Sequence, residues 1–224
     1  MRLGVLFSGG KDSCFALYKA SKEHEIVCLM SMRSKNPDSY MFHTPNTDYI
    51  TLQAESMGIP LLWGTTKGEK EIELEDLISL IKSAVKKYRI EGIVTGAIAS
   101  VYQASRIQKI CDNLNIKCVN PLWQKDQIGL LKELLENKFE VVITKVAAFS
   151  LDESFLGKKL DNDIIKKLYD LQSKYKINPA GEGGELETFV TYAPMFRKRI
   201  IIKKSKTDYA DNLGFFIIEK AVLE

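Results

Sequence analysis

The chain has 224 residues, 45% of them hydrophobic, which is enough to build one large domain or two smaller ones. Its 32 Lys and Arg residues against 29 Asp and Glu leave a net charge of +3, which argues against a surface dedicated to stable nucleic-acid binding but not against a local basic patch. The sequence has no apolar run near the roughly 20 residues of a membrane span and no signal-peptide pattern, so we expect a cytoplasmic protein with no membrane partner.

The first predicted element is a buried strand that leads through a glycine turn into a helix. Residues 3–7 form an apolar run, and residues 14–20 take on helical spacing. The glycines between them let backbone N–H groups approach an anion, and the helix adds the positive end of its dipole. The turn is therefore predicted to bind phosphate, through Ser8, Gly9, Gly10, Lys11, Asp12 and Ser13.

Asp12 indicates that this loop also binds a metal. The loop is too short for a Walker A motif, and its lysine is followed by an acid. A carboxylate beside a phosphate repels it unless a cation lies between them, so Asp12 predicts Mg²⁺.

The rest of the first half alternates strand and helix. We predict strands over residues 26–32, 60–64, 92–98 and 116–119, and helices over residues 46–56, 71–88 and 101–114, the first helix with Asn46 as its N-cap and Gly58 as its C-cap residue. This alternation predicts an α/β fold with a doubly wound parallel sheet.

The sequence Asn-Pro-Leu-Trp at residues 120–123 breaks the alternation of strands and helices. We therefore predict a domain boundary there, with a nucleotide-binding domain over residues 1–120 and a smaller α+β substrate domain over residues 121–224. In the second part we predict helices over 127–136 and 161–175, strands over 140–146, 188–192, 199–203 and 215–221, and irregular structure over 177–184.

An acidic, glycine-rich stretch over residues 181–188 is the second candidate site. Three carboxylates within six residues repel one another unless a partner compensates. The candidate partners are a metal, Arg106 or ammonium, and the alternative is a solvated acidic turn. The residues selected here are Glu182, Gly183, Gly184, Glu185, Glu187 and Thr188.

Four further residues are candidates for the same site. Gly96 lies at the carboxyl end of a predicted strand, where ligands bind in open α/β sheets. Tyr102 and Arg106 share one face of the next helix, and Arg106 suits a phosphate or carboxylate, or else an ordinary surface salt bridge. His43, in the loop after the second strand, either contacts a nucleotide or is structural.

The SGGKDS sequence of residues 8–13 resembles the PP-loop of the N-type ATP pyrophosphatases. This superfamily splits ATP between its α and β phosphates. The resemblance implies an adenine nucleotide alpha-hydrolase-like, Rossmann-like fold and an ATP-binding first domain.

Further motifs resemble the diphthine ammonia ligase family, in its minimal, archaeal-type form. They are GAI with Tyr102, Gln103 and Arg106, then PLW at residues 121–123, and GEGGELETFV at residues 181–190 with Ala193-Pro194. Leu186 departs from the aromatic residue we expect there. The resemblance implies ATP-dependent amidation of the diphthine carboxylate on translation elongation factor 2, giving diphthamide, AMP and pyrophosphate.

The resemblance and the residues together assign roles. Ser8, Gly10, Lys11, Asp12 and Ser13 are expected to activate ATP, and Glu182, Glu185, Glu187, Tyr102 and Arg106 to form the acceptor and ammonia side. We see no room for a glutaminase domain, so free ammonium is the expected nitrogen source, and a homodimer is expected.

Two other functions are left open by the sequence. One is a PP-loop enzyme that modifies tRNA, although paired cysteines for thiolation and a strong basic excess are missing. The other is a sensor that binds ATP or AMP without turnover, which has no need of a metal-linked acid beside its lysine.

Overall fold

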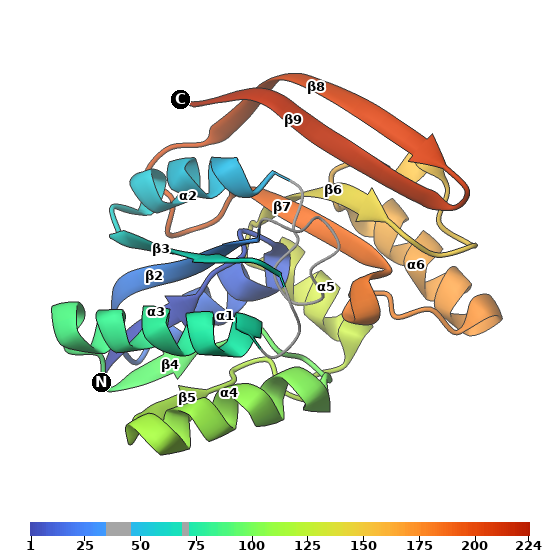
Figure 1. The fold of residues 1–224 in the computed structure, drawn as a ribbon. Helices are drawn as coiled ribbons and strands as arrows, with labels where there is room; N and C mark the ends of the chain where they lie inside the picture. Colours follow the sequence, from blue (N-terminus) through green and yellow to red (C-terminus); the bar gives the residue numbers. More distant parts are fainter. Residues whose placement is uncertain (35–45, 69–71) are drawn as a thin grey trace.

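Two β-sheets organise the chain in the computed structural model, which describes residues 1–34, 46–68 and 72–224 (Figure 1). The first sheet is parallel, in the order β3-β2-β1-β4-β5, and this confirms the predicted doubly wound α/β architecture. Its strands are β1 (Arg2–Leu6), β2 (Glu25–Ser34), β3 (Leu61–Thr66), β4 (Gly92–Val94) and β5 (Lys117–Val119).

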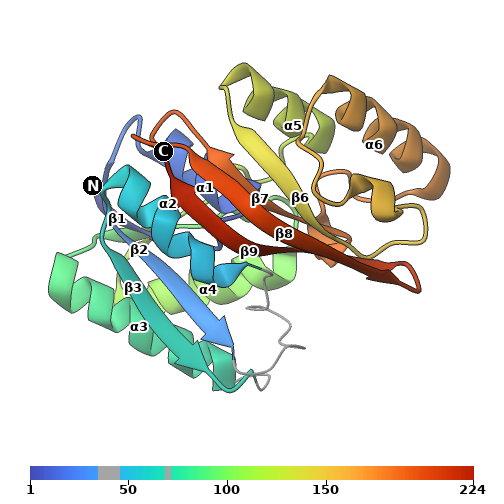
Figure 2. The ribbon, with the colours of Figure 1, turned by 90° about the horizontal axis from the view of Figure 1, so that it is seen from above.

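Helices cover both faces of this sheet. The helices are α1 (Lys11–Ala20), α2 (Ile50–Met57), α3 (Ile72–Tyr88) and α4 (Val101–Leu114). Buried residues of α1 and α2 belong to one hydrophobic cluster, and those of α3 and α4 belong to a second cluster, as expected for helices on opposite faces (Figures 1 and 2).

The fourth strand ends earlier than predicted, at Val94 instead of residue 98. Beyond it, the N–H groups of Ile98 and Ala99 donate to the carboxylate of Glu182, so they are not available to a sheet ladder. An apolar sequence after a strand therefore forms an irregular segment here, because a distant side chain accepts its hydrogen bonds.

Asn46 directly precedes the helical segment, as the sequence predicts, but its side chain does not cap it. A short 3-10 turn, η1 (Thr47–Tyr49), precedes α2, and Asn46 has a φ of 70° without a capping hydrogen bond. Its side chain instead donates to the Phe216 carbonyl (3.0 Å) and accepts from the Ile218 N–H (2.6 Å). At the other end of α2, Gly58 has a φ of 68°, which confirms it as the C-cap residue.

The second sheet is antiparallel, in the order β7-β6-β9-β8. Its strands are β6 (Glu140–Val146), β7 (Leu186–Tyr192), β8 (Ile200–Ala210) and β9 (Leu213–Leu223), and the other elements of this half are α5 (Gln127–Glu136), α6 (Asn162–Tyr175) and the 3-10 turns η2 (Glu153–Phe155) and η3 (Glu182–Gly184).

The last two strands are much longer than the predicted ones and form a hairpin (Figure 2). Asp211 (φ 50°) and Asn212 (φ 64°) both adopt the left-handed conformation, which matches the twist of a two-residue hairpin turn. Residues 203–208 of β8 are exposed and include three lysines, so this part of the strand lacks the apolar alternation from which a strand is predicted.

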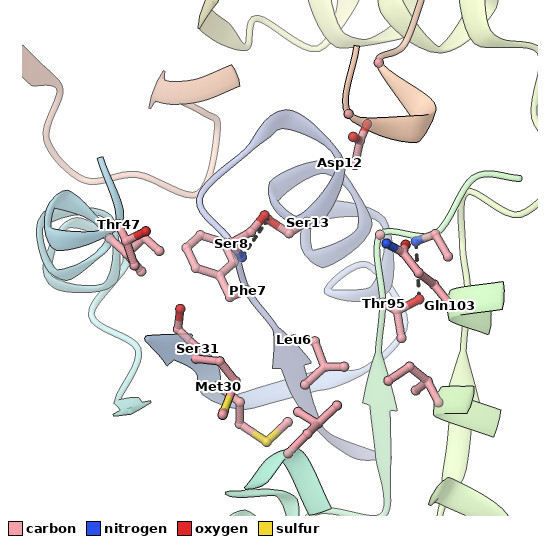
Figure 3. Close-up of a pocket in the computed structure, with 18 of the residues that line it drawn as sticks. Leu6, Phe7, Ser8, Asp12, Ser13, Met30, Ser31, Thr47, Thr95 and Gln103 are labelled. Atoms are coloured by element: carbon pink, nitrogen blue, oxygen red, sulfur yellow. Dashed lines mark hydrogen bonds between the residues drawn. The ribbon is translucent and has the colours of Figure 1, made fainter. Parts of the chain in front are cut away.

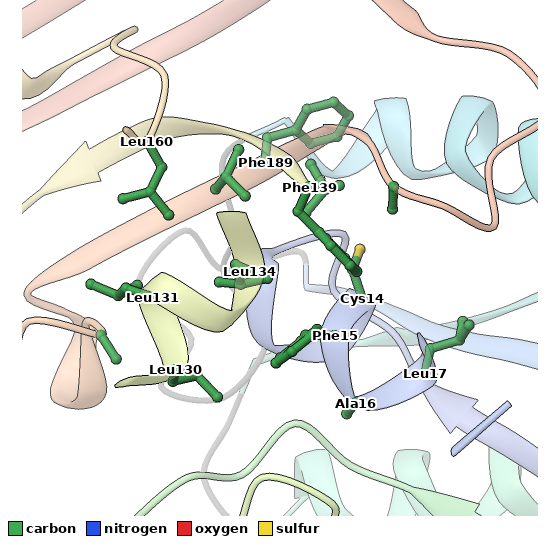
Figure 4. Packing of buried hydrophobic residues seen from close by; sticks show 14 of the residues in the cluster. Cys14, Phe15, Ala16, Leu17, Leu130, Leu131, Leu134, Phe139, Leu160 and Phe189 are labelled. Atoms are coloured by element: carbon green, nitrogen blue, oxygen red, sulfur yellow. The ribbon is translucent and has the colours of Figure 1, made fainter. Parts of the chain in front are cut away.

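One continuous core joins the two sheets (Figure 4). The Phe15 ring of α1 contacts the Phe139 ring, which directly precedes β6, edge to face at a centroid distance of 5.3 Å. Such an aromatic pair adds about 0.5–1.5 kcal/mol to the effect of burial alone. The helix that follows the glycine turn is therefore fixed against the second sheet as well as the first.

Among the described residues, no helix has both the length and the apolar character needed to cross a membrane.

Candidate active site

A cavity of about 310 Å³ lies at the carboxyl ends of β1, β2 and β4 (Figure 3). The strand order reverses between β1 and β4, and ligands bind at this position in doubly wound sheets. The volume is in the lower part of the range of about 300–1,000 Å³ that is typical of small-molecule sites. Of the residues predicted for the site, those that line the cavity are Ser8, Asp12, Ser13, Gly96, Glu182, Gly183 and Gly184.

The phosphate loop, residues 8–13, is closed by its own hydroxyl groups. The Ser13 hydroxyl accepts from the Ser8 N–H (3.2 Å) and donates to the Gly10 carbonyl (3.1 Å). The two serine oxygens lie 3.2 Å apart, and both residues line the cavity (Figure 3). The loop therefore presents hydroxyl groups and the N-terminus of α1 to the cavity, an arrangement suited to an anion.

The phosphate loop also lies along the free edge of β7. The Lys11 N–H donates to the Thr188 hydroxyl (3.0 Å), and the Val190 N–H donates to the Gly9 carbonyl (3.1 Å). Thr188 is buried below the loop and does not line the cavity. A Cβ on Gly10 would lie 3.2 Å from the Thr188 carbonyl oxygen, so close packing against β7 favours glycine at this position.

The Lys11 ammonium is buried, and it contacts the protein and not the cavity. Lys11 is 2% exposed, and its Nζ lies 3.0 and 2.9 Å from the two carboxylate oxygens of Asp12. The same Nζ donates to the Ala180 carbonyl, just before the acidic stretch. In this structure the lysine thus holds residues 180–184 against the phosphate loop, while Asp12 lines the cavity.

The electrostatics of Asp12 reflect this environment. Burial raises the pKa of the Asp12 carboxyl above its ordinary value of 3.8; the adjacent Lys11 ammonium opposes that shift, and the negative charge of Glu182 adds to it. The carboxylates of Asp12 and Glu182 therefore lie near each other at the cavity. The buried ammonium of Lys11 lies between the phosphate loop and Ala180.

Glu182 connects the acidic stretch to the segment after β4. One of its carboxylate oxygens accepts hydrogen bonds from the N–H groups of Ile98 and Ala99, both at 3.1 Å. Since Gly183 and Gly184 also line the cavity, the turn η3 forms part of its wall.

Glu185 and Glu187, the other two acidic residues of this stretch, do not line the cavity. The three carboxylates therefore do not gather in one site. Glu185 accepts from the Asn178 N–H (2.6 Å), and Glu187 pairs with Lys145 (2.9 Å). Side chains alternate along a strand, so Glu187 points away from the face that carries Leu186 and Thr188, which are both buried. The repulsion expected from the sequence is thus relieved by a separate partner for each carboxylate.

Asp12 is the site's candidate metal ligand, because it is the carboxylate of the phosphate loop and it lines the cavity. Mg²⁺ is commonly held by one or two carboxylates together with substrate phosphates and water. The cavity-facing carboxylate of Asp12 in the phosphate loop fits that pattern.

On α4 the residues that line the cavity are Gln103 and Ile107, not Tyr102 and Arg106. The Arg106 guanidinium lies over the Tyr102 ring, 3.4 Å from its centroid. Both pairs have the i, i+4 spacing of one helix face, and they differ by one residue, or about 100° of rotation. The sequence indicates which face of α4 turns towards the cavity, because Gln103 lies one helical turn before the apolar Ile107.

Three other polar residues that line the cavity were not predicted, namely Ser31, Thr47 and Thr95. Ser31 interrupts the apolar run of β2 near its carboxyl end, and this position in a buried strand is a usable signal. Thr95 follows β4 directly, and its hydroxyl donates to the Asn120 side chain (2.5 Å).

Gly96 lines the cavity, and its lack of a side chain also allows close packing on α1. A Cβ at this position would lie 2.8 Å from the backbone of Asp12 and Ser13. The close approach of the first turn of α1 is therefore sufficient to require glycine at this position. His43, the remaining predicted residue, lies outside the described residues.

A doubly wound parallel sheet with an SGGKDS loop at its switch point defines an α/β nucleotide-binding protein of the PP-loop type. Two family models match the chain, the diphthamide synthase N-terminal domain over residues 1–118 and the diphthamide synthase C-terminal domain over residues 126–223. The chain belongs to the diphthamide synthase family.

Individual relatives agree with this family. The diphthine–ammonia ligase of Rattus norvegicus is 38% identical over 226 residues, covering 92% of this chain and 84% of the relative. That of Schizosaccharomyces pombe is 37% identical over 219 residues, covering 90% of this chain and 36% of the relative. A solved structure described as a predicted subunit of tRNA methyltransferase from Methanocaldococcus jannaschii is 16% identical, covers 87% of this chain and 98% of that chain, and has a TM-score of 0.43, which is too low to carry an inference.

Proposed function

We propose that the protein is a diphthine–ammonia ligase, which uses ATP to join ammonium to the diphthine carboxylate on translation elongation factor 2 and so forms diphthamide. Membership of the diphthamide synthase family supports this function. The observation that carries it is the cavity at the switch point, where the phosphate loop, Asp12 and Glu182 meet.

The reaction requires activation of a carboxylate. Ammonia does not displace the oxygen of a carboxylate at neutral pH, because that oxygen is a poor leaving group. In the proposed reaction a diphthine carboxylate oxygen attacks the α-phosphorus of ATP, and pyrophosphate leaves. Ammonia then attacks the carbonyl carbon of the acyl-adenylate and loses a proton, and AMP leaves with the electron pair of the broken C–O bond.

The cavity suits the two ends of ATP differently. Its apolar wall, which includes Leu6, Met30 and Ile107, matches an adenine ring. Its polar end carries the hydroxyl groups of Ser8 and Ser13 beside the start of α1. Preorganised donors at that end stabilise the charge that develops on the departing pyrophosphate. The phosphate loop is therefore proposed as a pyrophosphate site.

Asp12 is the residue that we propose would hold Mg²⁺ together with the phosphates. When bound there, the ion would neutralise phosphate charge next to the carboxylate. Lys11 contacts both carboxylate oxygens of Asp12 and the Ala180 carbonyl, so its proposed role is to hold Asp12 and the start of the acidic stretch in place.

Glu182 is the carboxylate that we propose for the ammonium side of the site. It lines the cavity and lies close enough to Asp12 to influence its pKa, so the two negative charges attract a cation such as ammonium. Glu185 and Glu187 are proposed to support the turn η3 and β7. A homodimer and a domain boundary after residue 120 stay predictions.

The test is a reconstitution with the purified chain, ATP, Mg²⁺, ammonium and elongation factor 2 that carries diphthine. We expect AMP, pyrophosphate and diphthamide in equal amounts, with the amide identified by mass spectrometry. Elongation factor 2 with an unmodified histidine is the control and should yield neither amide nor AMP. Formation of ADP in place of AMP, or AMP formation without any amide, would contradict the proposal.

A further inference from the structure

Gln53 is a fully buried polar residue that the proposed reaction does not use directly. It lies in the middle of α2, its side chain is 0% exposed, and it does not line the cavity. Its Nε2 donates to the Gly9 carbonyl (2.9 Å) and to the Val190 carbonyl (2.8 Å). One side chain thus joins the phosphate loop, β7 and α2.

The chemistry of this junction requires an amide. Both partners are carbonyl oxygens, which only accept hydrogen bonds, so the side chain must supply two N–H donors. A glutamate would place an oxygen against two carbonyl oxygens. The other amide atom, Oε1, accepts no hydrogen bond from the residues that the structure describes, and a Cβ on Gly9 would lie 2.5 Å from it. The amide therefore also packs closely on the backbone of the loop.

The Gly9 carbonyl is constrained from two sides, because it also accepts from the Val190 N–H at 3.1 Å. Gly9 has a φ of 77°, so the chain reverses there just before it enters α1. Fixing this carbonyl fixes the peptide planes that follow, and with them the direction of the N–H groups at the start of the helix.

We propose that Gln53 is a positioning residue. By joining the phosphate loop to β7, it sets the geometry of the loop and thereby the affinity of the loop for the β- and γ-phosphates of ATP. The proposal rests on the proposed use of ATP at this loop. Loss of the Gln53 hydrogen bonds should therefore weaken the binding of ATP but not that of AMP, because AMP lacks the two phosphates that the loop is proposed to hold.

The test compares Gln53→Met, which keeps the volume but removes both donors, with Ser56→Ala as a matched control. Ser56 is also buried on α2, and its hydroxyl donates to the Lys198 carbonyl (2.6 Å) and accepts from the Lys198 N–H (3.1 Å). It thus joins the same helix to the second half of the chain without touching the phosphate loop. ATP and AMP affinities are measured by titration calorimetry on both variants, after thermal unfolding shows that each is folded.

We expect Gln53→Met to weaken ATP binding at least about tenfold and AMP binding less than about twofold, while Ser56→Ala changes neither. If Gln53→Met does not fold, Thr188→Val replaces it, since this change removes the hydrogen bond from the Lys11 N–H of the loop to β7 and should give the same ATP-selective loss. Equal weakening of ATP and AMP, or unchanged ATP binding, would overturn the role of Gln53. A wild-type chain that binds ATP but forms no diphthamide would instead overturn the proposed function alone.

Discussion

Replacement of Lys11 by Met tests whether the buried ion pair with Asp12 organises the site. Removing one partner of a buried pair typically costs about 3–5 kcal/mol. Because the Asp12 side chain is 33% exposed, water solvates part of the orphaned charge, and we expect a smaller loss of about 1–3 kcal/mol. At roughly 2–4 °C per kcal/mol for a chain of this size, the melting temperature should fall by about 2–12 °C.

The pH dependence of this loss has a definite sign. Burial already raises the pKa of Asp12 in the folded protein above 3.8, and Lys11 opposes that shift. Without Lys11 the folded pKa rises further, so the folded state favours the protonated carboxyl more strongly. The stability associated with the protonated form is complete below the unfolded pKa and is lost as the pH rises through the folded one. The deficit of Lys11→Met relative to wild type should therefore be smaller at about pH 4 than at about pH 7.

Thermal unfolding of wild type, Lys11→Met and the double variant with Asp12→Asn measures the effect, together with ATP-to-AMP turnover on diphthine-bearing elongation factor 2. The double variant should regain most of the lost stability, because no orphaned charge is left, but it should not regain turnover. A melting temperature within about 1 °C of wild type would refute the stability argument. Unaltered turnover in Lys11→Met would refute the assignment of this loop to ATP activation.

Two further substitutions test the walls of the cavity. Glu182→Ala removes the acceptor of two backbone N–H groups and should cost about 1–2 kcal/mol of stability, because the site is partly exposed. Glu182→Gln keeps an acceptor oxygen and should restore stability in thermal unfolding without restoring diphthamide formation; full activity in Glu182→Gln would show that its charge is not needed. Gly96→Ala forces a Cβ to within 2.8 Å of the backbone of α1, so we expect a loss of about 1–3 kcal/mol and a raised KM for ATP. Unchanged thermal unfolding and an unchanged KM would contradict the close packing of Gly96 on that helix.

The sequence by itself determined the first sheet and the place of the phosphate loop. Residues 2–6 form a strand because an apolar run followed by Ser8-Gly9-Gly10 has few other stable conformations once it is buried on both faces. These properties depend on residues that are neighbours along the chain.

The tertiary structure decided which side chains meet in the cavity. Nothing local distinguishes Glu182 from Glu187, and only the register of β7 turns Glu187 towards Lys145. One residue of helix rotation separates the predicted Tyr102 from Gln103, which lines the cavity.

Gln53 is the clearest case, because its two partners lie 44 and 137 residues away along the chain. A single glutamine in a short helix carries no signal of its own. Its importance follows from the folding of the second sheet against the first, which brings the two carbonyl groups to one buried amide. Contacts between residues so distant in sequence are set by packing, and local preferences do not encode them.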